Sequence, residues 1–366
     1  MAARRRSIDF VRPHLLSLKG YEAVEPPEIL ASRAGIPEPE IVKLDANESP
    51  YGPSPRVTEA MPGVSRVHLY PDPAQIAMRT AVGRYLGVDM EQVVIGNGSD
   101  EIIDLVFRTV LEQTDRVLIC VPTFGMYEFT AQVCGASTVE VQRDAEFQIN
   151  VDAVVSAVDK HTKIITVASP NNPSGNAVPR EIIERLLELD AIVMVDEAYA
   201  EFGGQSVVGL VKDYPNLIVL RTLSKWGGLA GLRAGYGVME TDMADLLLRA
   251  KPPYNVNQAT EHAILVSLSD TATLNQRVAA IKEERERMFN ALAKLPGVKP
   301  IPSDANFILC NVQNGQGKAI YDGLARRGVF VRYYSRASMA DYLRISVGTA
   351  GQTDRLLEAL AQCLED

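Results

Sequence analysis

The sequence of 366 residues contains few cysteines and few histidines, and their spacing excludes the commonest uses of either residue. The four cysteines are far apart and form no Cys-x-x-Cys pair, so neither a redox motif nor a zinc site is expected. The four histidines include no His-x-x-x-His spacing. We therefore predict buried free thiols and no metal site. The residues are Cys120, Cys134, Cys310 and Cys363, and His14, His68, His161 and His262.

Long apolar runs and clustered positive charge are also lacking. No run reaches the roughly 18 apolar residues of a membrane span, and the basic residues 4–6 are followed by no apolar signal core. With 37 Lys and Arg against 46 Asp and Glu, the net charge is −9, and residues 4–6 are the only basic cluster. We therefore expect a cytoplasmic protein that binds neither membrane nor nucleic acid. Any anionic ligand must be held by a local site, against the overall field.

The composition, with 46% hydrophobic and 23% charged residues, is that of an ordinary globular protein, and the length predicts two domains. Short apolar runs without alternation recur between Val93 and Val238, as is typical of strands buried on both faces. Helix-like stretches separate them, so the pattern predicts a mostly parallel, doubly wound α/β sheet. The runs are residues 117–121, 163–167, 191–195 and 217–220, and the helix-like stretches are 101–112, 125–134 and 179–189.

After residue 257 the sequence pattern changes to a long charged helix-like stretch, followed by alternating strand-like and helix-like segments. This change predicts a second, smaller α+β domain. Its expected strands are residues 306–312, 329–334 and 342–347, and its expected helices are residues 275–295, 317–327 and 352–364. The first 44 residues are rich in proline and hold one expected short helix, at 28–34. The predicted organisation is an arm (1–44) that packs with the small domain and a partner subunit, a large domain (45–257) and a small domain (258–366).

Polar residues follow four of the apolar runs, at the points where the strands end. In an open α/β sheet, ligands bind outside the carboxyl ends of the strands. Each segment alone has an ordinary interpretation, as a turn, a helix cap or a tight connection. Their combination is more informative. The segments are residues 96–100, 169–175, 196–199 and 221–225.

Together these segments match the needs of pyridoxal phosphate. Lys225 at a strand end can form the Schiff base, and the carboxylate of Asp196 can keep the pyridine nitrogen protonated, which makes the ring an electron sink. Free backbone N–H groups of residues 98–100 at a helix N-terminus can cradle the phosphate, with Ser224 and Arg233 adding donors. The ordinary interpretation of an arginine such as Arg233 is a surface ion pair, which is the more common role of this residue type.

Three motifs are highly specific in combination: Ser-Pro-Asn-Asn-Pro-Ser-Gly at 169–175, Asp-Glu-Ala-Tyr at 196–199, and Arg-Thr-Leu-Ser-Lys at 221–225 with Gly-Leu-Ala-Gly-Leu-Arg-Ala-Gly-Tyr at 228–236. They resemble the signatures of fold-type I, class II pyridoxal-phosphate aminotransferases. Within that class the sequence most resembles the histidinol-phosphate aminotransferases, over nearly the whole chain. Further segments that carry this resemblance are residues 44–52, 69–72, 96–101, 122–127, 253–257 and 343–349.

The resemblance implies a role for each cofactor-binding residue. Lys225, Asp196 and Tyr199 would be the catalytic residues. Lys225 would be the Schiff-base residue, Asp196 would pair with the pyridine nitrogen, and Tyr199 would bind the ring hydroxyl oxygen together with Asn172. The remaining contacts would be the backbone N–H groups of Ser99 and Asp100, the side chains of Ser224 and Arg233, the ring of Phe124, and Tyr70 from the partner subunit.

The resemblance also implies the substrates. Tyr21, Asn47, Arg332 and Arg344 would meet them, the two arginines by charge-assisted bonds to an anionic group. The expected reaction transfers an amino group between L-histidinol phosphate and 2-oxoglutarate by a ping-pong mechanism, in histidine biosynthesis, and gives imidazole acetol phosphate and glutamate. Lys225 would act as general base and acid at the substrate Cα and cofactor C4′.

Three alternatives stay open at the level of the sequence. An aromatic amino-acid aminotransferase or a threonine-phosphate decarboxylase of the same fold would share these motifs, which do not determine the substrate. A non-catalytic pyridoxal-phosphate module of a regulator would need a DNA-binding domain, and no basic helix-turn-helix segment precedes the fold. Three features depart from the family pattern. Ser174 replaces the commoner Thr, and the segment after Arg332, residues 333–335, is aromatic. Trp226 replaces a small residue, either as core filler or as a change in pocket shape.

Tyr70 lies in a Pro-flanked loop, residues 67–73, that cannot lie in the middle of a sheet. One interpretation is a surface turn in which Tyr70 packs on its own domain. The resemblance instead implies that Tyr70 crosses a two-fold interface, so that a homodimer shares its active sites.

Overall fold

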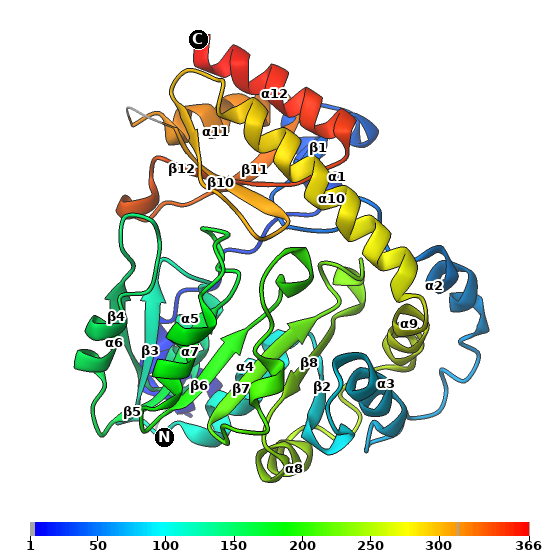
Figure 1. Ribbon diagram of the computed structural model, residues 1–366, viewed down its shortest axis with the longest axis vertical. Coiled ribbons are helices and arrows are strands. Elements are labelled where there is room, and N and C mark those ends of the chain that lie inside the picture. Colours follow the sequence, from blue (N-terminus) through cyan, green and yellow to red (C-terminus); the bar gives the residue numbers. More distant parts are fainter. Residues whose placement is uncertain (1–3, 313–314, 366) are drawn as a thin grey trace.

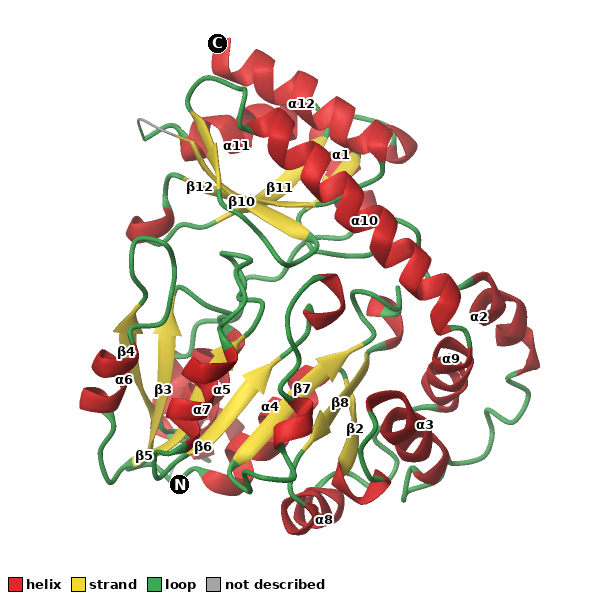
Figure 2. Ribbon diagram, in the orientation of Figure 1, coloured by secondary structure: helices red, strands yellow, loops and turns green. Residues whose placement is uncertain are grey.

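The computed structural model describes residues 4–312 and 315–365, which contain two β-sheets (Figures 1 and 2). The strands of the larger sheet are β2 (Val93–Asn97), β3 (Arg116–Val121), β4 (Ser137–Gln142), β5 (Thr162–Ala168), β6 (Ile192–Asp196), β7 (Leu217–Thr222) and β8 (Ala234–Val238). Their order is β2-β8-β7-β6-β5-β3-β4, and only β8 runs antiparallel to its neighbours. The predicted mostly parallel α/β sheet is confirmed.

Helices cover both faces of this sheet, which explains why its strands are continuous apolar runs. Val193 and Val195 of β6 belong to one apolar core, whereas Met194 between them belongs to another. The first core is completed by α3 (Ile76–Leu86), α6 (Val151–Ala157), α7 (Arg180–Leu187) and α9 (Gln258–Ser269). The second is completed by α4 (Ser99–Val110), α5 (Met126–Cys134) and α8 (Thr241–Ala250).

The smaller sheet has the order β1-β11-β12-β10-β9 and lies above the carboxyl ends of the larger sheet in Figure 1. Its strands are β1 (Val42–Leu44), β9 (Val298–Pro300), β10 (Phe307–Val312), β11 (Val329–Tyr333) and β12 (Tyr342–Ser346). Its helices are α10 (Thr271–Leu292), α11 (Gly317–Arg326) and α12 (Ala350–Glu365). The end of the arm thus forms an edge strand, β1, parallel to β11.

Two features of the arm and the connecting region go beyond the sequence expectation. Besides α1 (Pro27–Ala34), the arm contains short 3-10 helices, at Ser7–Phe10, Pro13–Ser17 and Glu38–Glu40. The helix α9 lies in a segment where the sequence predicted no element, and it packs beside α3 and α2 (Pro55–Ala60). The predicted domain boundaries at residues 44 and 257 stay a prediction.

The burial of the cysteines agrees in part with the expectation. Cys120 and Cys310 are buried, whereas Cys134 and Cys363 are only partly buried. Within residues 4–312 and 315–365, no helix is both long and apolar enough to cross a membrane.

Candidate active site

A cavity of about 480 Å³ lies where the carboxyl ends of the large-sheet strands face the smaller sheet. Its wall contains all of the candidate residues except Tyr70. Those residues are Tyr21, Asn47, Ser99, Asp100, Phe124, Asn172, Asp196, Tyr199, Ser224, Lys225, Arg233, Arg332 and Arg344. Segments that are far apart in the sequence therefore meet at one site, as the strand-end argument predicted.

Lys225 follows β7 and reaches into this cavity. Its Nζ donates a hydrogen bond of 2.9 Å to the carbonyl oxygen of Ala46. Burial, helped by the positive charge of Arg344, lowers the pKa of Lys225 to about 8. About a tenth of the amine is therefore neutral at pH 7, far more than for an ordinary lysine, and a nucleophile or base must be neutral. Lys251 is turned away, because its Nζ donates to the carbonyl oxygens of Pro73 and Pro253, each at 3.0 Å.

Asp196 is the last residue of β6, in register with Ala168 of β5 and Leu220 of β7. Its Oδ2 accepts a hydrogen bond of 2.7 Å from the hydroxyl of Tyr127, and its Oδ1 accepts one of 3.0 Å from the backbone N–H of Ala198. Burial raises the pKa of Asp196 to about 6, although both hydrogen bonds act to lower it. The group is therefore mostly ionised at pH 7 and suited to hold a protonated ring nitrogen.

Tyr199 and Asn47 form a polar wall of the cavity. Nδ2 of Asn47 donates to the hydroxyl oxygen of Tyr199 at 3.0 Å. Asn47 itself has a left-handed backbone, with φ 54°, and its backbone N–H donates to Oγ of Ser346 at 2.9 Å. Burial raises the pKa of Tyr199 to about 12, so its hydroxyl stays neutral and can donate to a ligand oxygen.

The N-terminus of α4 forms a cradle for an anion. Gly98 precedes the helix with φ 85°, and a Cβ at this position would lie 2.5 Å from Nη2 of Arg233. A Cβ on Gly235 would lie 2.2 Å from the backbone nitrogen of Ser99. The backbone contact at Gly235 and the positive φ of Gly98 therefore both favour glycine. Nη2 of Arg233 also binds Oδ2 of Asp100 at 2.9 Å, so the guanidinium lies beside the free N–H groups of the helix start.

Ser224 adds a hydroxyl to the cradle. Its Oγ lies 2.9 Å from Oγ1 of Thr222, the last residue of β7. The wall of the cavity thus combines an amine, a carboxylate, a neutral phenol and an anion cradle. These are the groups that pyridoxal phosphate requires, so the residues present fit this cofactor.

The two arginines are direct neighbours across the antiparallel pair β11 and β12, where Arg332 is in register with Arg344. Nη1 of Arg344 donates to Oδ1 of Asn172 at 2.7 Å, and Nη2 of Arg332 donates to the carbonyl oxygen of Glu22 at 2.7 Å. Because the oxygen of Asn172 is used in this way, its amide nitrogen is the atom left to donate to a ligand. Two guanidinium groups therefore present positive charge to one side of the cavity.

Aromatic rings also line the cavity. The ring of Phe124 makes edge contacts with Tyr127 of α5, at a centroid distance of 5.6 Å, and with Tyr21 of the arm, at 6.1 Å. The arm therefore reaches the cavity, in agreement with the expectation for Tyr21. Tyr70 lies elsewhere: it is 78% exposed and stacks on Tyr254 at 4.3 Å.

Trp226 does not line the cavity. Its ring is buried and stacks on Tyr85 at a centroid distance of 5.3 Å. Of the two interpretations left open by the sequence, the structure favours core filler.

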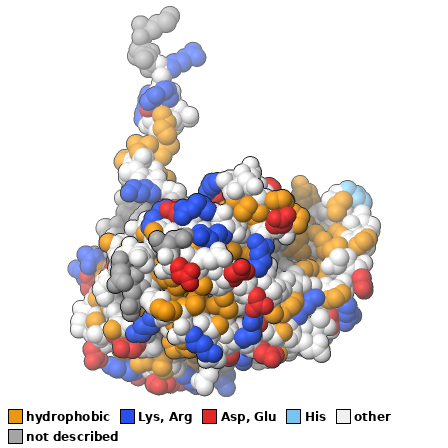
Figure 3. Space-filling view, turned by 90° about the horizontal axis from the view of Figure 1, so that it is seen from above, with side chains coloured by type: hydrophobic (Ala, Val, Ile, Leu, Met, Phe, Trp, Pro, Cys, Tyr) orange, Lys and Arg blue, Asp and Glu red, His pale blue; other side chains and the backbone are white. Residues whose placement is uncertain are grey.

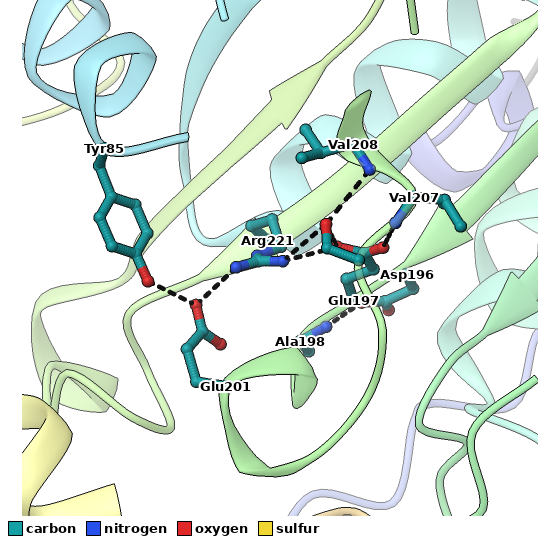
Figure 4. Close-up of polar contacts among 9 residues, drawn as sticks. Tyr85, Asp196, Glu197, Ala198, Glu201, Val207, Val208 and Arg221 are labelled. Carbon is teal, nitrogen blue, oxygen red and sulfur yellow. Dashed lines mark hydrogen bonds and ion pairs between the residues drawn. The ribbon is translucent and has the colours of Figure 1, made fainter. Parts of the chain in front are cut away.

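Sequence reasoning missed several residues next to the site. Tyr127 lies in the family-like segment 122–127, but nothing in its spacing indicates a contact with Asp196. Glu197, Glu201 and Arg221 form a buried ion cluster behind the cavity (Figure 4). Glu197 and Arg221 also lie inside the motifs, yet only the pairing of β6 with β7 brings them together.

Comparisons with known proteins agree with this geometry. The family model for aminotransferase class I and II matches residues 39–360. The histidinol-phosphate aminotransferase of Roseiflexus castenholzii is 47% identical over 361 residues, which cover 96% of this chain and 97% of that protein. The chloroplastic enzyme of that name from Nicotiana plumbaginifolia is 43% identical over 354 residues, with 96% and 86% covered.

A similar solved structure is that of histidinol-phosphate aminotransferase from Sinorhizobium meliloti in complex with pyridoxal-5'-phosphate. Its TM-score is 0.89 at 26% sequence identity, with 97% of this chain and 98% of that chain covered. The chain therefore belongs to the class I and II aminotransferases, and among them to the histidinol-phosphate aminotransferases.

Proposed function

We propose that this pyridoxal-phosphate-dependent aminotransferase transfers the amino group of L-histidinol phosphate to 2-oxoglutarate, in histidine biosynthesis. The observation that carries the proposal is the single cavity in which Lys225, Asp196 and the anion cradle face two arginines. The names of the relatives with 47% and 43% identity support the choice of amino donor.

The cofactor's phosphate would lie against the N-terminus of α4, with Ser99 and Asp100 offering backbone N–H groups and Ser224 and Arg233 offering side-chain donors. Phe124 would cover one face of the ring. When bound, pyridoxal phosphate supplies a carbonyl for the amino group and a ring that delocalises electrons from the substrate Cα. Tyr199 and Asn172 would donate to the ring oxygen and so fix the tilt of the ring.

Lys225 would hold the cofactor before the substrate arrives, and its amine would then take the proton from the substrate Cα. Its lowered pKa, about 8, fits this work, since a base is most useful near the working pH. Asp196 would keep a proton on the ring nitrogen by its negative charge. Its two hydrogen bonds, from Tyr127 and from Ala198, hold it in position for that contact.

Arg332 and Arg344 would bind the phosphate of histidinol phosphate in one half-reaction and a carboxylate of 2-oxoglutarate in the other. Both anions accept charge-assisted, bidentate hydrogen bonds from guanidinium groups. Tyr21 and Asn47 would contact the substrate from the arm and from the loop after β1. Residues 21–24 of the arm line the cavity and would help to shield the reacting Cα from water.

We further propose that the enzyme works as a homodimer in which Tyr70 reaches the cofactor phosphate of the partner subunit. Tyr70 and the neighbouring Val67 and Leu69 are exposed apolar side chains, as are Phe10 and Leu16 of the arm. Figure 3 shows the start of the arm standing out from the body of the molecule. Several exposed apolar side chains on one loop, such as Val67, Leu69 and Tyr70, are typical of an interface. The cytoplasmic location stays a prediction.

A panel of amino donors tests the substrate. The purified holoenzyme is mixed with one donor at a time, and the loss of the cofactor's visible absorption is followed in a single turnover. L-histidinol phosphate should react fastest. Faster reaction with phenylalanine or tyrosine would support an aromatic aminotransferase, and release of CO₂ from threonine phosphate would support a decarboxylase; either result would overturn the proposal.

A further inference from the structure

We infer that Arg221 is a positioning residue that holds Asp196 and Tyr199 in place relative to Lys225, an inference that rests on the proposed function. Its guanidinium is buried, with 6% of the side chain exposed. Nη1 binds Oε2 of Glu197 at 2.6 Å, and Nη2 binds Oε1 of Glu201 at 2.8 Å. Figure 4 shows the arginine between the two carboxylates.

The two glutamates of this cluster lie on either side of Tyr199 in the chain. Glu197 directly follows Asp196, and Glu201 lies in the 3-10 helix Ala200–Phe202. The segment between them carries Tyr199. One guanidinium therefore clamps both ends of the turn that presents Tyr199 to the cavity.

The arginine itself stands on β7, four residues before Lys225. It thus ties the turn after β6 to the strand end that carries Ser224 and Lys225. The backbone N–H of Glu197 adds a hydrogen bond of 2.9 Å to the carbonyl oxygen of Leu220, the residue before Arg221. The catalytic side chains of two neighbouring strands are therefore fixed to each other by a group that does not touch the cavity.

Further polar groups hold the glutamates in this arrangement. Oγ of Ser206 donates to Oε2 of Glu197 at 2.7 Å, and the backbone N–H of Val207 donates to Oε1 at 2.6 Å. The hydroxyl of Tyr85, on α3, lies 3.4 Å from Oε1 of Glu201, and Tyr236 of β8 also faces the guanidinium. Two buried carboxylates share one positive charge, so the loss of the arginine would leave both uncompensated.

A lysine at this position would keep the charge but lose the geometry. Guanidinium is a planar fork that binds two carboxylates in fixed directions, whereas an ammonium group is a point charge on a flexible stem. Arg221→Lys should therefore release one end of the turn. Glu201→Gln is a milder change, because the amide keeps the shape of the side chain and loses only one ion pair.

The test compares holoenzymes of Arg221→Lys and Glu201→Gln with wild type and with the control Arg143→Lys. Arg143, the residue after β4, is also a buried arginine, but its guanidinium donates to the carbonyl oxygens of Cys120 and Phe147, each at 3.0 Å, rather than to carboxylates. Three quantities are measured: the midpoint of the pH titration of the cofactor's visible absorption band, kcat and KM, and the melting temperature of the cofactor-free protein.

Displacement of Tyr199 removes a donor that favours the anionic form of the ring oxygen, so the titration midpoint should rise by about half a pH unit or more in Arg221→Lys. A slight misplacement of catalytic groups should lower kcat roughly tenfold to hundredfold, with KM within about twofold of wild type. Glu201→Gln should also raise the titration midpoint and lower kcat, each by a smaller amount than Arg221→Lys. Arg143→Lys should change neither, whatever its melting temperature.

The inference is overturned if the titration midpoint and kcat of the two cluster variants stay at the wild-type values, whether or not their melting temperatures fall. Should Arg221→Lys fail to fold, Glu201→Gln alone decides in the same way. The titration midpoint needs no amino donor. A wrong assignment of the substrate would therefore appear in the donor panel and leave this result intact.

Discussion

The hydroxyl of Tyr127 donates a hydrogen bond of 2.7 Å to Oδ2 of Asp196, so a residue of α5 orients the carboxylate at the end of β6. Tyr127→Phe removes this bond, and hydrogen bonds to charged groups contribute about 1.5 to 3 kcal/mol. We expect the dissociation constant of pyridoxal phosphate to rise about tenfold or more. Equilibrium dialysis of the cofactor measures this. An unchanged affinity would show that Asp196 is held well enough by Ala198.

Asp196→Asn should raise the stability of the cofactor-free protein and lower the activity of the holoenzyme. Burial raises the pKa of Asp196 from 3.8 to about 6, so the charged carboxylate costs folding free energy above pH 6 and nothing below about pH 4. At roughly 1.4 kcal/mol per pKa unit, the amide should stabilise the cofactor-free protein by about 2 to 3 kcal/mol at pH 7.5. Melting temperatures at several pH values check this, and the gain should vanish toward pH 4.

The same variant should bind the cofactor but remove the Cα proton of the donor far more slowly, because a neutral amide does not keep the ring nitrogen protonated. Near wild-type turnover in Asp196→Asn would mean that this carboxylate does not act on the ring nitrogen.

Arg332→Ala and Arg344→Ala should each weaken binding of the anionic substrates by roughly 2 to 4 kcal/mol, as expected for charge-assisted contacts in a partly dry site. Because one pair of arginines serves both substrates, both half-reactions should suffer. Arg336→Ala is the control, since Arg336 pairs with Glu140 at 2.8 Å and does not line the cavity. A loss confined to one half-reaction would mean that the two substrates use different anchors.

A mixed dimer tests the shared active site. Tyr70→Arg and Lys225→Ala are each expected to be inactive as homodimers. If Tyr70 serves the partner's site, the heterodimer contains one site with both native residues and should recover part of the activity. Heterodimers confirmed by native mass spectrometry that show no recovery would place Tyr70 in its own subunit's site or outside any site.

Much of the fold could be predicted because the large-sheet strands are buried on both faces. Their apolar runs are continuous, and the ends of β5, β6 and β7 follow directly from them. The short strand β1 escapes such reasoning, since three residues carry no periodicity. β4 lies at the edge of the sheet, where of its residues only Val141 is buried, and its Ser, Thr, Glu and Gln give little apolar signal.

The candidate site was predictable to the extent that its residues occur in motifs. Lys225, Asp196 and Tyr199 stand at strand ends, where the chemistry of each side chain indicates its use. Contacts that depend on how elements pack could not be predicted in this way. The hydrogen bond from Tyr127 to Asp196 depends on how α5 packs on the sheet. The stacking of the exposed Tyr70 on Tyr254 does not identify the residues that Tyr70 would contact in a partner subunit.

The central claim is that Lys225 carries the cofactor, and chemical trapping tests it most directly. The holoenzyme is reduced with borohydride, which fixes the cofactor to the amine that binds it, and the labelled peptide is identified by mass spectrometry. We expect a single label on Lys225 and none in Lys225→Ala, since Lys251 is bound to backbone carbonyl oxygens outside the cavity. A label on Lys251 or on any other lysine of the wild-type enzyme would contradict it.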